Sequence, residues 1–203
     1  YELSALRRQE LGRRMEVLLT TDYSQLVAAV RPFRAIHHLR EAKILNVAES
    51  SPADYPEAVK RQFGTEIKRV PRERVLEFYS AVSDQDAQAE SDYWLKHAAA
   101  VVEPSREEVF KSCRLALAFQ KLMDEEEATV ITVDCYGSMW RKLPAYPCLG
   151  FTRLNDLGLG GICQSDLACA VVHVLFQGLS GRPSFVCNPT FDFARDQATL
   201  IHC

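Results

Sequence analysis

The chain has 203 residues, of which 47% are hydrophobic and 25% are charged, and its formal net charge is −3. That is enough apolar material for a hydrophobic core in one large domain or two small ones. Because no basic stripe with interleaved aromatic residues occurs, we do not expect nucleic acid as a partner. No apolar run approaches the ~18 residues of a membrane span, so we expect no membrane partner either.

The cysteines and the N-terminal residues indicate the compartment. Seven cysteines occur without any CxxC pair, which leaves a zinc site of that type unsupported. An odd number without framework spacing is typical of reduced, buried thiols. The first 19 residues carry charges throughout, unlike a signal peptide. We therefore predict a cytoplasmic protein.

The apolar pattern changes along the chain from a helical period to an alternation of strands and helices. Over residues 1–41 it predicts two helices, the second beginning after Thr21-Asp22 and ending at Pro32. The later expected elements are a strand at 43–50, a helix at 52–64 closed by Gly64, a strand at 65–70, a helix from Pro71, helices at 84–102 and 104–123, and a strand at 128–135. This alternation is typical of an open, mostly parallel, three-layer α/β fold of the Rossmann-like kind.

The order of elements divides the chain into three segments. Residues 1–41 are expected to be a helical join from a missing N-terminal domain, and residues 42–153 a Rossmann-like middle domain. A run rich in Gly and Pro at 142–161 is typical of a connector, so residues 154–203 are expected to begin a second α/β or α+β domain. Since the chain starts inside a helical pattern and stops after a strand, we expect a truncated piece of a longer protein.

Ligands in open α/β sheets bind at the carboxyl ends of the strands. The first such end is VDCYGSMW, residues 133–140, where polar and aromatic residues follow the strongest strand. Asp134 is either a turn residue that caps the next segment or part of a substrate-lining loop. In the second case Tyr136 and Trp140 contact the substrate, and Trp140 stacks on the face of a sugar.

The second candidate end is GICQSDLACAVVHVLFQGLSGRPSFVCNP, residues 161–189. A helix expected at about 165–179 is apolar on all sides and therefore expected to be buried, with Gln164 and Asp166 at its start. A short buried strand is expected to follow and to stop at Asn188-Pro189. Polar side chains are thus expected at both ends of this unit.

The same residues resemble a known family. The run LPAYPCLGFTRLNDLGLGGICQSDLACAVVHVLFQGLSGRPSFVCNP is similar to the sugar ketol-isomerase superfamily of L-fucose isomerase and L-arabinose isomerase, especially its fucose-isomerase-like members. The similarity is clearest over residues 128–203, which implies that the segment from 154 begins the catalytic domain. It also implies aldose–ketose isomerisation of a pentose or deoxyhexose through a cis-enediol, with Mn²⁺ as the usual metal. A homo-oligomer, a trimer or a hexamer, is implied as well.

The resemblance places two carboxylates at the metal, one at the start of the helix and one at the end of the next strand. The matching positions, 24 residues apart, are Gln164 and Asn188, and His202 resembles a metal-site histidine of the arabinose branch. An amide oxygen is a neutral and weaker ligand for Mn²⁺, and an amide cannot act as a general base. Asp166 is either the remaining carboxylate or the cap of the helix.

Two functions from different classes follow. The first is a metal-assisted sugar isomerase, in which Gln164, Asn188 and His202 contact metal or sugar. In it, Asp166 or a residue outside this chain transfers the proton. The second is a non-catalytic carbohydrate-binding or regulatory relative, in which the amides supply hydrogen bonds in place of charge. A third possibility is a structural fragment whose function lies in a missing segment. In the first two, the expected partner is a small sugar.

Overall fold

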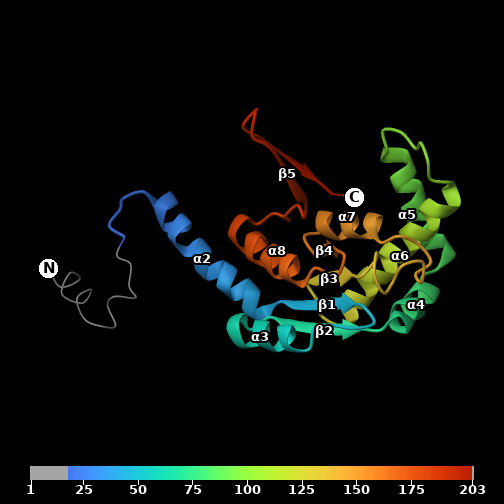
Figure 1. Ribbon diagram of the computed structural model, residues 1–203, viewed down its shortest axis with the longest axis horizontal. Coiled ribbons are helices and arrows are strands. Elements are labelled where there is room, and N and C mark those ends of the chain that lie inside the picture. The colour runs from blue at the N-terminus through green and yellow to red at the C-terminus, as the bar shows by residue number, and fades with distance from the viewer. Residues whose placement is uncertain (1–17, 203) are drawn as a thin grey trace.

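The computed structural model describes residues 18–202, and Figure 1 shows how the elements are arranged. In chain order they are α2 (Tyr23–Glu41), β1 (Lys43–Val47), α3 (Asp54–Phe63), β2 (Glu66–Val70), α4 (Arg72–Ala81), α5 (Asp84–His97), α6 (Arg106–Glu125), β3 (Val130–Val133), α7 (Cys148–Asp156), β4 (Gly160–Cys163), α8 (Leu167–Ser180), β5 (Asn188–Asp192) and β6 (Gln197–Ile201). The helix expected before Thr21 lies almost wholly outside the described residues.

Four strands form one parallel sheet in the order β2-β1-β3-β4. The register places Val47 of β1 opposite Val133 of β3, and Val133 opposite Cys163 of β4. The carboxyl ends of these three strands therefore meet at one edge of the sheet. The chain leaves β1 for β2 on one side and returns to β3 on the other, so the topological switch point lies between β1 and β3. This arrangement confirms the predicted open, parallel α/β fold.

Helices cover both faces of the sheet, because alternate strand residues point to opposite sides. On one face, Ile44 and Val130 pack with residues of α2, α3 and α8. On the other face, Leu45 and Ile131 pack with residues of α4, α6 and α7. All four side chains are fully buried. The chain therefore has the three-layer core that the pattern predicted.

Local signals set the ends of several helices. Gly64 adopts a left-handed conformation with φ of 84°, and its N–H donates to the carbonyl of Lys60, so it ends α3 as predicted. Ser105 and Glu108 form a reciprocal capping box at the start of α6, in which each side chain accepts a backbone hydrogen bond from the other residue. Both ends could be predicted because the signal is carried by neighbouring residues.

The prediction that α2 ends at Pro32 is wrong, since the helix runs on to Glu41. Proline removes a backbone donor from a helix interior, and packing must offset the loss. Ala35 and Leu39 are buried against α8. The two helices approach so closely at Gly178 that a Cβ there would lie 2.7 Å from the Cα of Ala35, which leaves no room for a larger residue. This close approach anchors the C-terminal half of α2, while Figure 1 shows its N-terminal half extending past the sheet.

The sheet continues past the boundary predicted between residues 153 and 154. That boundary falls inside α7, and the strand that follows it, β4, pairs with β3 along its whole length. α8 then packs against α2, β3 and β4. Residues up to Ser180 therefore complete the first α/β unit and do not begin a second one. The run at 142–161 misled the prediction because it folds into the short helix α7 and the start of β4.

Two expectations for the following segment are also wrong. α8 is not buried on all sides, since Val172 and Phe176 are 44% and 51% exposed. No regular strand forms over residues 183–187, and β5 begins at Asn188, where a strand was expected to end. β5 and β6 form an antiparallel hairpin whose strand residues are all exposed and which projects from the body of the molecule (Figure 1).

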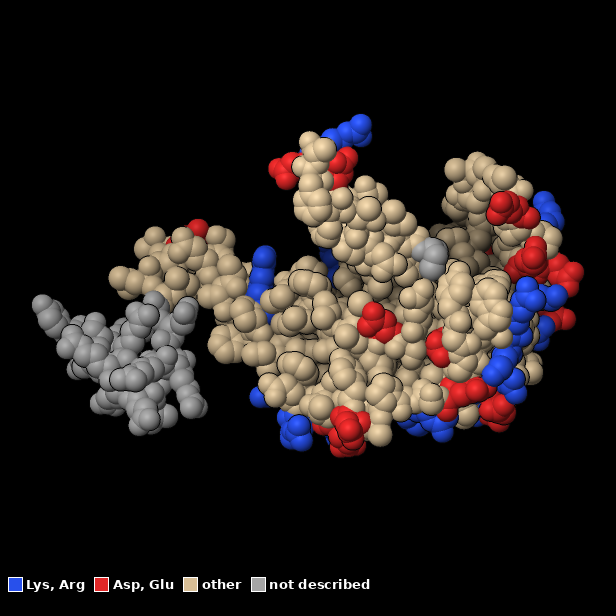
Figure 2. All heavy atoms as spheres, viewed as in Figure 1, with Lys and Arg blue, Asp and Glu red and all other residues tan. Residues whose placement is uncertain are grey.

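Charged side chains of both signs gather over α4, α5 and α6, at one end of the molecule (Figure 2). Several form ion pairs, among them Arg74 with Glu77 and Arg114 with Asp84. Mixed pairs of this kind are typical of solvated helix faces and contribute little to stability. Within residues 18–202, no helix is both long enough and apolar enough to cross a membrane.

Candidate functional site

Backbone hydrogen bonds tie the carboxyl edge of the sheet together. The carbonyl of Val133, the last residue of β3, accepts one from the N–H of Cys135 at 2.8 Å and one from the N–H of Ser165 at 3.0 Å. The first closes a three-residue turn that ends β3, and the second joins β3 to the turn after β4. The loops that follow the two strands are therefore held beside each other.

A buried amide links the turn after β4 to β1. Asn46, fully buried in β1, accepts a hydrogen bond from the Ser165 hydroxyl at 2.5 Å and donates one to Ser51 at 3.4 Å. Gln164 and Ser165 both adopt left-handed conformations, with φ of 62° and 54°. Non-glycine residues reach that region with some strain, so the bond to Asn46 holds a strained turn. Asn46 was not predicted, although a polar residue inside the apolar strand KILNV signals a buried hydrogen bond.

Asp134 caps the turn that follows β3. Its Oδ2 accepts a hydrogen bond from the N–H of Ser138 at 2.6 Å, and a Cβ added to Gly137 would lie 2.3 Å from its Oδ1. The Ser138 hydroxyl in turn accepts a hydrogen bond from the N–H of Glu49, in the loop after β1, at 3.0 Å. Of the two roles open for Asp134, the structure therefore supports the cap, which also connects the loops of β1 and β3.

Tyr136 and Trp140 form an exposed aromatic pair beside this turn. Their ring centroids lie 5.2 Å apart with an interplanar angle of 25°, and the residues are 56% and 41% exposed. The ring of Tyr146 lies 5.8 Å from that of Trp140, and the Arg141 guanidinium lies 5.8 Å from the Trp140 centroid. The two residues predicted to contact a substrate thus lie together and offer flat surfaces to solvent. Their role as substrate contacts stays a prediction.

Asp166 caps the N-terminus of α8. Its Oδ1 accepts a hydrogen bond from the N–H of Cys169 at 2.8 Å, so the capping alternative is the one that the structure supports. Burial, reinforced by the Asp166 carboxylate, raises the pKa of the Cys169 thiol to about 11. The Cys169 thiol therefore stays protonated near neutral pH, and the Asp166 carboxylate accepts a hydrogen bond from the first turn of α8.

The three predicted metal ligands belong to two different sheets. Gln164 follows β4 with its side chain exposed, whereas Asn188 begins β5 in the hairpin. Asn188 is opposite Ile201 in the hairpin register, which places it next to His202. The structure therefore brings Asn188 and His202 to one end of the hairpin, and Gln164 to the edge of the four-stranded sheet.

This donor set does not fit a divalent manganese ion. Gln164 and Asn188 offer neutral amide oxygens, His202 offers one imidazole, and Asp166 is engaged as a helix cap. Mn²⁺ is a hard cation that carboxylates hold best. Among the side chains of residues 18–202, there is no group of three or more His, Cys, Asp or Glu that could hold a metal ion. No catalytic step through a metal follows from this arrangement.

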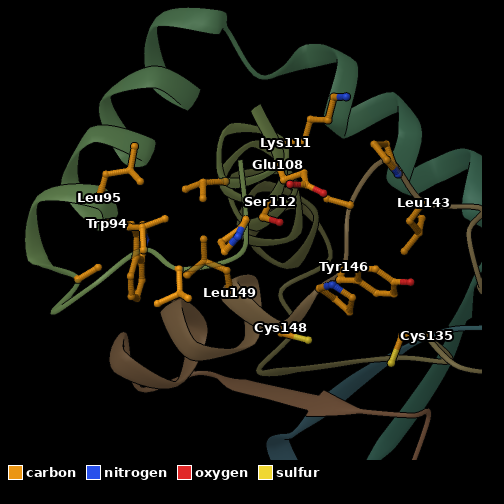
Figure 3. A pocket seen from close by; sticks show the side chains of 18 of the residues that line it. Trp94, Leu95, Glu108, Lys111, Ser112, Cys135, Leu143, Tyr146, Cys148 and Leu149 are labelled. Atoms are coloured by element: carbon orange, nitrogen blue, oxygen red, sulfur yellow. The ribbon is translucent and has the colours of Figure 1, made fainter. Parts of the chain in front are cut away.

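A cavity of about 730 Å³ opens between α5, α6 and the segment that joins β3 to α7 (Figure 3). Its wall is mostly apolar, with Leu95, Leu143 and Leu149 among the lining residues. Tyr146 also lines it and so connects the cavity to the aromatic pair. The volume lies in the range of small-molecule sites. The cavity could not be predicted, because its walls come from segments that are not adjacent in the sequence.

His173 has a structural role at the opposite end of β4, beside Gly160, the first residue of the strand. Its Nδ1 lies 2.8 Å from the hydroxyl of Ser184, and a Cβ added to Gly160 would lie 3.0 Å from its ring. Burial lowers the pKa of the imidazole, which therefore stays neutral near neutral pH. His173 thus fastens the segment after α8 to the core.

The carboxyl edge combines an exposed aromatic pair, an exposed amide and loops held by buried hydrogen bonds, beside an apolar cavity. Two carboxylates of this edge, Asp134 and Asp166, act as caps, and a third, Glu49, pairs with Lys142. Such a surface can bind a polar molecule that has a flat apolar face. A comparison with known protein families finds no match to this chain, and a comparison with curated proteins finds no relative.

Proposed function

We propose that this protein binds a sugar at the carboxyl edge of its sheet, as a non-catalytic relative of the sugar ketol isomerases. The observation that carries the proposal is the stacked pair Tyr136–Trp140, exposed next to the topological switch point. The face of a pentose or deoxyhexose carries C–H groups that pack on an aromatic ring, while its hydroxyl groups point outward. An exposed aromatic pair at this edge suits such a ligand.

Hydrogen-bonding groups at the same edge match the hydroxyl groups of a sugar. The exposed amide of Gln164 can both donate and accept, and the Arg141 guanidinium beside Trp140 can donate. The cavity next to Tyr146 has room for substituents of the ring. Because Gln164 is uncharged, it suits a neutral ligand that brings no charge to be balanced.

Proton transfer is not part of the proposal. Isomerisation needs a base that removes a proton from carbon, and the amides of Gln164 and Asn188 cannot act as one. Asp134 and Asp166 both accept backbone hydrogen bonds that hold them as caps. The aldose–ketose isomerase with Mn²⁺ that the resemblance implies is therefore the alternative that an experiment must distinguish.

Isothermal titration with L-fucose, L-arabinose, D-arabinose and D-ribose, each with and without Mn²⁺, tests the proposal. We expect a saturable heat with at least one sugar that Mn²⁺ does not change. Trp140→Ala should weaken binding at least about tenfold, or about 1.4 kcal/mol, because it removes the stacking surface. Tyr23→Ala is the matched control, since Tyr23 is an 82% exposed aromatic residue at the N-terminal end of α2.

Two outcomes would overturn the proposal. The absence of heat with every sugar would exclude binding of this class of ligand. Ketose formation from an aldose in the presence of Mn²⁺ would establish the enzymatic alternative instead.

A further inference from the structure

Two cysteines lie side by side at the carboxyl edge of the sheet. The Sγ atoms of Cys135 and Cys163 are 3.5 Å apart, and each residue is only 4% exposed. Cys163 ends β4 opposite Val133, and the turn closed by the Cys135 N–H onto the Val133 carbonyl folds Cys135 back beside it. The strand register and the turn therefore build this contact.

The geometry of the pair is close to that of a disulfide. A disulfide has an S–S length of about 2.05 Å. The two sulfur atoms would need to approach by about 1.5 Å, a movement on the scale of a side-chain rotation.

The environment of Cys135 differs from that of other buried thiols. The hydrogen bond with Cys163 and the backbone amides of Gln164 and Tyr136 lower the pKa of the Cys135 thiol, although burial opposes them. Burial raises the pKa of Cys113 to about 12. Because the thiolate is the nucleophilic form, Cys135 is prepared to react near neutral pH and Cys113 is not.

The cavity gives small molecules access to Cys135. Cys135 lines it together with Met139 and Tyr146, and Figure 3 shows the Cys135 sulfur on the side of the cavity nearest the sheet. Of the two paired cysteines, Cys135 is the one among the lining residues. A molecule that enters therefore reaches Cys135 before Cys163, and the apolar walls favour one without charge. The exposed Cys148 lines the same cavity.

We propose that Cys135 and Cys163 form a thiol–disulfide exchange site that accepts a small uncharged disulfide from the cavity. The Cys135 thiolate attacks one sulfur of the disulfide R–S–S–R, forms a mixed disulfide and expels R–S⁻, which takes up a proton. Cys163 then gives up its proton, attacks the Cys135 sulfur and expels the second R–S⁻. The small disulfide is reduced to two thiols, and the cysteine pair is oxidised to a disulfide. The exchange does not require sugar binding, although the same cavity lies beside the proposed sugar site.

The test uses the whole chain, first reduced and then exposed to bis(2-hydroxyethyl) disulfide, with the products mapped by mass spectrometry of proteolytic peptides. We expect a cross-linked peptide pair that joins Cys135 to Cys163 and carries no adduct. In Cys163→Ser the reaction should stop at a stable mixed disulfide on Cys135, because the second thiol is gone. In Cys135→Ser, Cys163 should stay unmodified. Cys113→Ser is the matched control and should leave the cross-link unchanged.

A second probe reads the pair in the native chain, where folding is not in question. Phenylarsine oxide binds two neighbouring thiols without any oxidant, so it should protect both Cys135 and Cys163 from alkylation by iodoacetamide. Cys148, which is exposed, should stay reactive. Adducts confined to other cysteines while Cys135 stays unmodified, or a failure of the arsenical to protect Cys135, would overturn the proposal.

Discussion

The four-stranded sheet and the hairpin are both made of strands, yet different interactions hold them. β3 and β4 bury every residue between two helical layers, whereas every residue of β5 and β6 is exposed. The sheet is stabilised by apolar area removed from water, and the hairpin by its own hydrogen bonds and turn. The position of a side chain at the sheet edge is therefore fixed by the packed core. The position of one on the hairpin is fixed only by the hydrogen bonds between β5 and β6.

The predicted metal ligands divide between these two regions. Gln164 lies at the edge of the sheet, and Asn188 and His202 lie at one end of the hairpin. The spacing of 24 residues that matches the isomerase pattern is present in the sequence, but the strand that would carry Asn188 to the sheet is not formed. Spacing along a chain thus identifies a site only when both segments join the same sheet.

The largest expected effect is a loss of stability that follows substitution in the core of the sheet but not in the hairpin. Ile131→Ala in β3 should lower the free energy of unfolding by about 2–5 kcal/mol, because the side chain is fully buried and its removal leaves a cavity. Leu200→Ala in β6, where the residue is 56% exposed, should lower it by less than about 0.5 kcal/mol. Urea titration followed by circular dichroism measures both. Equal losses would mean that the hairpin packs as tightly as the sheet.

A smaller effect is expected where the carboxyl edge is held together. Asn46→Ala should lower the free energy of unfolding by about 1–3 kcal/mol, because the Ser165 hydroxyl loses its buried partner. Ser51→Ala is the control, and it should cost less than about 1 kcal/mol since it removes only the 3.4 Å hydrogen bond. Hydrogen exchange at residues 164–166 should accelerate in the first variant alone. Unchanged stability and exchange in Asn46→Ala would show that the amide does not hold this turn.

The smallest effect, on Mn²⁺ binding, is expected when carboxylates replace the amides of two predicted metal ligands, Gln164 and Asn188. Gln164→Glu combined with Asn188→Asp should create no Mn²⁺ binding that calorimetry detects, because the two positions belong to separate sheets. Gln25→Glu combined with Gln62→Glu adds the same charge at exposed helix positions and serves as the control. Specific Mn²⁺ binding with isomerase turnover in the first variant alone would show that the hairpin reaches the sheet edge and that the native chain has lost a metal site.

The elements of the sheet could be predicted because their signals are local. The β-branched run ATVITVDC contains β3, and its buried residues match the requirement of a central strand for apolar side chains. Gly64 ends a helix and Ser105 starts one, and each does so through bonds to residues three or four positions away. The place of Tyr136 and Trp140 in the loop after β3 was likewise predicted, but the stacking of their rings on each other was not.

The remaining features depend on contacts between distant segments. Ser165 and Asn46 are 119 positions apart, and neither residue type points to the other. The run PSFVCNP is apolar enough for a strand, but Pro183 at its start has no N–H to give to a sheet ladder. An apolar run therefore predicts that a segment has an extended backbone, but it does not predict which sheet the segment joins.

The N-terminal half of α2, which extends past the sheet, affects the behaviour of the chain in solution. A helix of 19 residues is about 28 Å long, and only its C-terminal half is anchored by Ala35 and Leu39. At equal mass, a body with such an extension has a larger frictional coefficient than a sphere and sediments more slowly. The extension also exposes Val27, Val30 and Phe33, so salts that strengthen apolar contacts should lower the solubility of the chain.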